Sequence, residues 1–121
     1  MTSDGYEDYR VPVAEQDRTK AGVALHVVSA LSGVPVAQMT RLRTTPRATR
    51  ARWIAMYLAH VAFGWTLERV GHVFGLNRAT AGTACRWVED ERDQLEFDRV
   101  VDGMERTIGA LFALPRIEVQ P

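Results

Sequence analysis

The sequence predicts an all-α fold, a small helical bundle that contains a helix-turn-helix and has an extra C-terminal helix. Apolar residues recur at spacings of three and four in several segments, which is typical of helices with one buried face. A glycine or proline follows four of these segments and ends each of them, at Gly33, Gly64, Gly75 and Pro115. No segment alternates like a half-buried strand, and no repeat is present. A length of 121 residues with 46% hydrophobic residues fits one compact domain with tails.

The N-terminal part of the chain predicts a tail, a helix and a short helical turn. Residues 1–17 are acidic and contain few apolar residues, so we expect a flexible tail. Apolar positions then predict a helix over 20–31. After a short connector, residues 36–42 are expected to form one or two helical turns with Met39 and Leu42 facing inward.

The central part predicts a basic loop followed by the remaining helices. Residues 41–52 are expected to form the loop, because Pro46 interrupts any continuous helix there. Thr66 and Asn77 precede apolar helical patterns and are suitable N-cap residues. The helices expected after the loop are 51–63, 67–74, 78–91 and one between 94 and 114.

Several classes of protein are excluded by simple counts. The single cysteine, Cys85, cannot form an internal disulfide or a multi-cysteine zinc site, and we expect it to be buried. His26, His60 and His72 lack metal-ligand spacing, so no metal or cofactor is expected. No apolar run approaches membrane-spanning length, and the acidic N-terminus does not resemble a secretory signal. We therefore expect a cytoplasmic protein without a membrane or small-molecule partner, and no catalytic residue pair is evident.

Charge is unevenly distributed along the chain although the formal net charge is zero. Residues 1–17 have a net charge of −4 and residues 89–121 a net charge of −5. Residues 18–88 contain ten arginines or lysines and one acid, Glu68, which gives +9. Local charge governs attraction to a polyanion, so the middle segment indicates nucleic acid as a partner.

The segment 66–89 has the form of a helix-turn-helix, whose second helix lies in the DNA major groove in many proteins. Arginine suits guanine acceptors, and threonine suits base edges or the thymine methyl group. Arg69 and Arg86 could contact phosphates. The alternative is an ordinary helical hairpin in a bundle. The predicted contact residues at the start of the second helix are Asn77, Arg78, Ala79, Thr80 and Thr83.

The basic loop favours the DNA-binding interpretation over the plain hairpin. It contains five arginines without a comparable set of acids nearby, whereas a solvated charged loop usually mixes both signs. Such a loop is typical of a minor-groove arm or a phosphate clamp. Its arginines are Arg41, Arg43, Arg47, Arg50 and Arg52.

Residues 51–90, ARWIAMYLAHVAFGWTLERVGHVFGLNRATAGTACRWVED, resemble the C-terminal DNA-binding domain of the bacterial replication initiator DnaA. That family has a pattern close to AR-x-x-AMYL, then S/T-L-x-x-I-G-x-x-FG, then R-D-H/R-[ST]-T-V-x-H-A-C. The resemblance extends over the upstream helix and basic loop, and it assigns residues 18–92 to such a domain. It implies that Arg47, Arg50 and Arg52 contact the minor groove and backbone.

Four departures from the family pattern lie in the segment that contacts bases. Leu76 replaces arginine, Asn77 replaces aspartate, Ala79 replaces serine or threonine, and Thr83 replaces a common histidine. We therefore expect a DNA site different from that of the initiator. The sequence also lacks the G-x-x-x-x-G-K-[ST] phosphate loop, so no ATPase is expected.

The resemblance implies transcription regulation rather than replication. Stand-alone domains of this kind occur in α-proteobacteria as regulators, and one group is similar to the DNA-binding half of gene transfer agent activators that act with a sigma-factor-like protein. The alternative is a non-enzymatic adaptor or replication-control protein that binds initiator-type boxes or the replication or transcription machinery.

Residues 93–121 are expected to form a C-terminal helix and tail. The helix packs on its own domain or presents its apolar face to a sigma-like protein or RNA polymerase. The apolar residues concerned are Val100, Val101, Met104, Ile108, Leu111 and Phe112. We expect Trp53, Trp65 and Trp87 to belong to the core.

Overall fold

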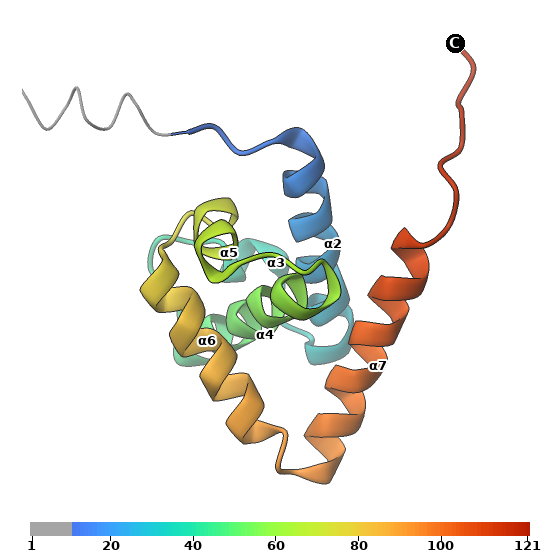
Figure 1. The fold of residues 1–121 in the computed structure, drawn as a ribbon. Coiled ribbons are helices and arrows are strands. Elements are labelled where there is room, and N and C mark those ends of the chain that lie inside the picture. The colour runs from blue at the N-terminus through green and yellow to red at the C-terminus, as the bar shows by residue number, and fades with distance from the viewer. Residues whose placement is uncertain (1–10) are drawn as a thin grey trace, which may run out of the picture.

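A computed structural model describes residues 11–121, and every regular element in this range is a helix, as predicted (Figure 1). The expectation for residues 1–10 lies outside the described range. None of the helices described has the length and apolar character to cross a bilayer. The helices are α2 (Glu15–Ser32), α3 (Val36–Met39), α4 (Pro46–Ala62), α5 (Leu67–Val73), α6 (Arg78–Glu91) and α7 (Leu95–Phe112).

Helix α4 lies at the centre of the fold and packs against each of the other five helices. Helices α2 and α7 lie on one side of it, and α5 and α6 lie on the other (Figure 1). One buried cluster, which includes Leu58 and Ile108, connects α4 mainly with α2 and α7. A second, which includes Met56 and Val70, lies between α4, α5 and α6. The helix-turn-helix therefore rests on the same central helix as the rest of the domain.

Two helices begin earlier than the sequence predicted, so two predicted helix boundaries were wrong. Helix α2 begins at Glu15 rather than at residue 20, so the last residues of the predicted tail are helical. Helix α4 begins at Pro46, so the predicted basic loop 41–52 is a short loop followed by a helical turn. Proline is favoured at the first helical position, where no N–H is needed, and the Thr45 hydroxyl accepts the Ala48 N–H at 3.1 Å. Proline starts this helix rather than breaking it.

The short helix α3 ends at Met39, and only part of its predicted apolar pair is buried. Met39 is fully buried, as expected. Leu42 was predicted to face inward but is fully exposed, because the chain has left the helical conformation before it.

Helix α7 packs on its own domain through Val101, Met104 and Ile108. Val100 and Leu111, also expected on the apolar face, are 45% and 47% exposed. The expected packing of this helix on its own domain is therefore confirmed for part of the apolar face, and the expected contact with a partner protein stays a prediction.

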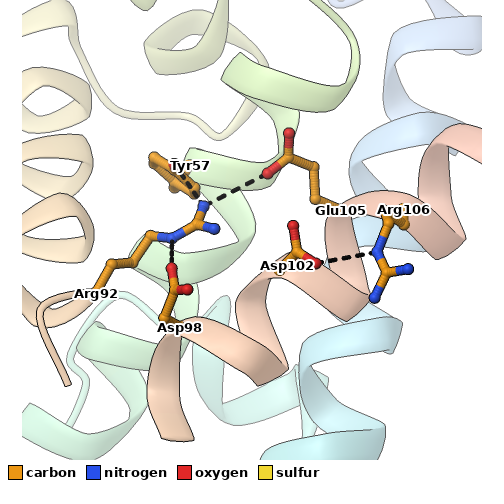
Figure 2. Close-up of polar contacts among 6 residues, drawn as sticks. All are labelled: Tyr57, Arg92, Asp98, Asp102, Glu105 and Arg106. Atoms are coloured by element: carbon orange, nitrogen blue, oxygen red, sulfur yellow. Dashed lines mark hydrogen bonds and ion pairs between the residues drawn. The ribbon is translucent and has the colours of Figure 1, made fainter. Parts of the chain in front are cut away.

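A cluster of polar side chains centred on Arg92 fixes the corner between α6 and α7 (Figure 2). The Arg92 guanidinium donates to Asp98 Oδ1 at 2.6 Å, to the Tyr57 hydroxyl at 2.9 Å and to Glu105 Oε1 at 3.5 Å. These contacts raise the pKa of Arg92, chiefly through the hydrogen bond to Asp98. Since the acceptors come from α4 and α7, one side chain connects three helices. Figure 2 also shows an exposed pair within α7, Asp102 with Arg106 at 3.0 Å.

The cysteine and tryptophans lie largely inside the domain. Cys85 is buried, as predicted, and burial raises the pKa of its thiol to about 11. Trp65 is 2% exposed and belongs to the core. Trp53 and Trp87 are half-buried, with ring centroids 5.9 Å apart in an edge arrangement, and Trp87 also contacts Phe97. The core prediction is confirmed for Trp65 and holds only in part for the other two.

Candidate nucleic-acid interface

The connection between α5 and α6 is a tight turn over residues 74–77. The Phe74 N–H donates to the Val70 carbonyl at 3.0 Å, and the Leu76 N–H donates to the Gly71 carbonyl at 2.7 Å. Gly75 has φ +72°, a left-handed conformation that glycine adopts without steric cost. The turn reverses the chain so that α6 crosses α5 directly after leaving it.

Gly71 lies where the two helices of this unit cross. A Cβ atom at this position would lie 2.5 Å from the Asn77 carbonyl oxygen and 2.8 Å from the Arg78 nitrogen. These are backbone atoms, which cannot move aside as a flexible side chain can. The absence of a side chain at Gly71 therefore sets the position of the start of α6.

Asn77 caps α6 through its side chain. Its Oδ1 atom accepts the Thr80 N–H at 2.9 Å, which satisfies one of the free donors of the first turn. The side-chain carbonyl of this predicted contact residue is thus engaged inside the protein. Its side-chain NH₂ group is the part that can donate to a ligand.

Helix α6 presents, from Arg78 to Arg86, an exposed face that contains most of the predicted contact residues. Arg78, Ala79, Thr83 and Arg86 are exposed, and Thr80 is half-buried. The Arg86 guanidinium folds back along the helix, with Nη2 3.5 Å from the Thr83 hydroxyl. The opposite face of α6 is buried against α4 and α5 through Ala81, Ala84, Cys85 and Val88.

The five arginines of the predicted basic loop separate into two groups. Arg41, Arg43 and Arg50 are exposed. Arg47 donates from Nη2 to the Ser32 carbonyl at the end of α2, at 2.9 Å. Arg52 is half-buried and lies 3.4 Å from the Met39 carbonyl.

The arginines that bond carbonyl groups and the arginines that face solvent have different roles in the basic segment. Burial lowers the pKa of Arg52, and its Nε atom is buried without an acceptor among the described residues. Arg47 and Arg52 connect α4 to the end of α2 and to α3. They therefore support the basic segment, whereas Arg41, Arg43 and Arg50 face solvent.

Arg69, which the sequence suggested as a phosphate contact, pairs with an acid in the structure. It donates to both carboxylate oxygens of Asp17, at 2.8 and 3.0 Å, and lies 4.8 Å from the centre of the Trp65 ring. The hydrogen bond from Arg69 lowers the pKa of the Asp17 carboxyl. Arg69 thus connects α5 to the first turn of α2, and its predicted contact with phosphate is not favoured.

The arginines also differ in whether they form an ion pair with a carboxylate. Within residues 11–121, Arg69, Arg92 and Arg106 pair with carboxylates, and all three lie outside the exposed face of α6. The arginines without a carboxylate partner in this range include Arg41, Arg43, Arg50, Arg78 and Arg86. Arg18, Arg99 and Arg116 also lack one, but most of the unpaired arginines in this range lie on α6 or in the basic segment.

The fold places the basic segment beside α6. A hollow of ≈ 300 Å³ is lined by Thr44, Pro46, Thr49 and Arg50 from the segment, and by Trp53 and Trp87. We call it the Arg50–Trp87 hollow. Sequence reasoning did not assign Thr44, Thr49 or Trp87 to the interface. One signal was present for Trp87: it follows Thr80 by seven residues and Thr83 by four, so the three share one side of α6.

Comparison with known proteins finds both a matching family and a similar solved structure. Residues 24–88 match the family profile described as the bacterial DnaA protein helix-turn-helix. A crystal structure described as a DNA replication initiation factor superposes with a TM-score of 0.68 at 25% sequence identity. The superposition covers 78% of this chain and 30% of that chain, so the similarity concerns under a third of the larger protein. No curated protein matches the sequence.

Proposed function

Because the chain belongs to the family of the bacterial DnaA helix-turn-helix, we propose that it is a non-enzymatic, sequence-specific regulator of transcription that binds duplex DNA. In this proposal α6 lies in the major groove and the basic segment contacts the backbone or the minor groove. The protein acts at promoters in the bacterial cytoplasm, associated with the nucleoid.

The observation that carries the proposal is the exposed face of α6 from Arg78 to Arg86, whose two arginines have no carboxylate partner among the described residues. A helix can approach base edges closely only where its side chains are small or able to bond them. Ala79 is small, and Arg78 has no carboxylate partner among the described residues. Arg78 at base edges would give specificity, and Arg86 at a phosphate would give affinity.

Within the basic segment, the structure favours different roles for the arginines. Arg41, Arg43 and Arg50 are exposed and suit phosphate or minor-groove contacts. Arg47 and Arg52 bond backbone carbonyls and act mainly by holding the segment in place, although Arg47 remains exposed. Asn77 contributes its side-chain NH₂ group, while Thr80 and Thr83 lie next to the groove floor.

The proposed DNA site differs from that of the initiator because the base-contacting segment differs. Leu76, Asn77, Ala79 and Thr83 replace the residues typical of the family. Alanine at residue 79 removes a hydroxyl that could bond a base edge, and Thr83 replaces an imidazole with a shorter side chain. A change of site suits control of a separate set of genes, for which the gene transfer agent genes are the candidate.

Activation would require a protein partner, and α7 offers a surface for one. Val100 and Leu111 are about half exposed, and Leu114 is 65% exposed beyond the helix. Helices α6 and α7 diverge from the corner that joins them (Figure 1), so a sigma-factor-like protein could bind α7 while DNA is bound to α6. We propose that the protein is an activator of this kind.

The first experiment is selection of bound duplexes from a random pool, followed by gel shift across a salt series. The wild-type protein should enrich one motif and lose affinity steeply as salt rises. Arg78→Gln should reduce the preference for the enriched motif, while Arg50→Gln should weaken enriched and scrambled duplexes alike. Arg106→Gln, exposed and outside the interface, is the matched control. If no motif is enriched and all three variants behave alike, the chain is an adaptor that does not recognise DNA sequence.

A further inference from the structure

We propose that the Arg50–Trp87 hollow binds a single phosphate and its deoxyribose from the DNA backbone. This inference rests on the proposed function and adds a subsite to it, between the two DNA-contacting elements. The hollow is open to solvent and is formed by three parts of the chain: the end of the α3–α4 loop, the first turns of α4, and the middle of α6.

The charge of the hollow suits a phosphate. Arg50 lines it and is exposed, with no carboxylate partner among the described residues. The other residues that line it carry no charge. A guanidinium can bond two phosphate oxygens at once, which fixes the position of the phosphate as well as attracting it.

Hydroxyl groups provide the second part of the site. The hydroxyls of Thr44 and Thr49 hydrogen bond to each other. In such a pair one hydroxyl donates to the other, and the proton of the acceptor stays free for a further acceptor. This free hydroxyl proton gives the wall of the hollow a donor that its own atoms do not satisfy, which favours an acceptor-rich ligand.

The aromatic rings provide a surface for the sugar. Trp87 packs against Trp53 and Phe97 in T-shaped arrangements, with ring centroids 5.9 and 6.0 Å away, so its orientation is fixed by packing. Together with Pro46 it gives one wall of the hollow an apolar surface. A deoxyribose can pack on such a surface while its phosphate meets Arg50. Full stacking of a base is less suited, because Trp87 is half-buried.

The location of the hollow beside α6 indicates what a bound phosphate would do. Trp87 lies one turn beyond Thr83, on the same side of α6. A phosphate in the hollow would fix how far α6 is inserted into the groove. The contact is to the backbone, so it would contribute equally to binding of every sequence.

The test measures affinity for two duplexes, one enriched by the wild-type protein and one with its sequence scrambled. Thr49→Val and Trp87→Phe keep the approximate shapes of the side chains, and each should weaken both duplexes by about three- to tenfold. The ratio of the two affinities should not change. Matched controls are Thr107→Val on α7 and Trp65→Phe in the core, which should leave both affinities within about twofold of wild type.

A second measurement locates the contact on the DNA. Single phosphates of the enriched duplex are replaced in turn by neutral methylphosphonates. At one position the replacement should weaken the wild-type protein but have little further effect on Arg50→Gln or Thr49→Val. Circular dichroism tests whether each variant is folded. If Trp87→Phe is not folded, the result for Thr49→Val decides the outcome.

Three results separate the possible failures. If Thr49→Val and Trp87→Phe bind like wild type while Arg78→Gln loses its preference, the hollow is not a subsite and the proposed function stands. If Trp87→Phe changes the affinity ratio, the hollow contacts a base, and the inference is wrong in its ligand. If the wild-type protein prefers no duplex, the proposed function itself fails.

Discussion

Replacing Gly71 by alanine should distort the crossing of α5 and α6. The added methyl group would lie 2.5 Å from the Asn77 carbonyl oxygen and 2.8 Å from the Arg78 nitrogen. Real Cβ atoms do not approach other atoms so closely, so the start of α6 must move away from α5. Because Asn77 and Arg78 belong to the proposed DNA-contacting residues, this movement changes both stability and DNA binding.

Two opposing effects determine how much Gly71→Ala changes the free energy of unfolding. Alanine stabilises a helix interior relative to glycine by about 0.5–1 kcal/mol, and overpacking costs about 1–3 kcal/mol. Gly22 in α2 provides a comparison, because a Cβ there has no other atom within 4 Å. Gly22→Ala should show the helix-forming gain alone. The difference in free energy of unfolding between the two variants should therefore be about 1–3 kcal/mol.

The assay is urea unfolding of both variants, followed by gel shift with the enriched duplex. We expect Gly22→Ala to be as stable as wild type or slightly more stable, with unchanged DNA binding. Gly71→Ala should be less stable and should bind the enriched duplex more weakly. Equal stability of the two variants would refute the argument that Gly71 sets the approach of the helices.

Four further variants or conditions test other contacts. Arg92→Met removes donations to three acceptors and should lower the free energy of unfolding by about 1–3 kcal/mol, whereas Arg106→Met should change it by less than about 0.5 kcal/mol; equal losses would contradict the proposed corner. Asn77→Ala should cost about 1 kcal/mol through loss of the α6 cap, and Asn77→Asp should retain most of it, as urea unfolding can measure. Cys85, with a pKa raised to about 11, should react slowly with a thiol reagent at neutral pH and rapidly once urea unfolds the protein; fast labelling of the folded protein would argue against its burial. The pKa of Asp17 is lowered in the folded state, so the stability it contributes is present above its unfolded pKa of about 3.9 and is lost as the pH falls through the folded pKa. Wild type should therefore lose more stability than Asp17→Asn between about pH 5 and pH 3, and identical pH profiles would show that the pair does not contribute.

The positions of the helices could be predicted from the sequence because apolar spacing records which face of each helix is buried. Residues 67–74 and 78–91 lie within about one residue of α5 and α6, since Thr66, Asn77 and Gly75 mark their ends chemically. The start of α4 was missed because proline has two opposite effects. Inside a helix it breaks the hydrogen-bond pattern, and at the first position it favours the start.

The use of each arginine could not be predicted from the sequence. Arg69 pairs with an acid 52 residues earlier in the chain, and no local pattern reports such a pair. Arg47 and Arg52 bond carbonyl groups of α2 and α3 that are brought near only by the fold. Counting charge along the chain therefore identified the basic region correctly but could not separate the arginines that support it from those that face solvent.

The distribution of charge along α6 would limit how DNA approaches the domain in the proposed complex. Arg78 and Arg86 lie in the part that faces solvent freely, while Glu89 and Asp90 are exposed in the last turns. The carboxylates would repel the phosphates of a duplex that extended past them, so in the proposed complex we expect the contact with α6 to end near Trp87. That residue lines the Arg50–Trp87 hollow, where the basic segment meets the helix. In the proposed complex the acids and the hollow therefore favour the same crossing point for the DNA backbone, by repulsion on one side and attraction on the other.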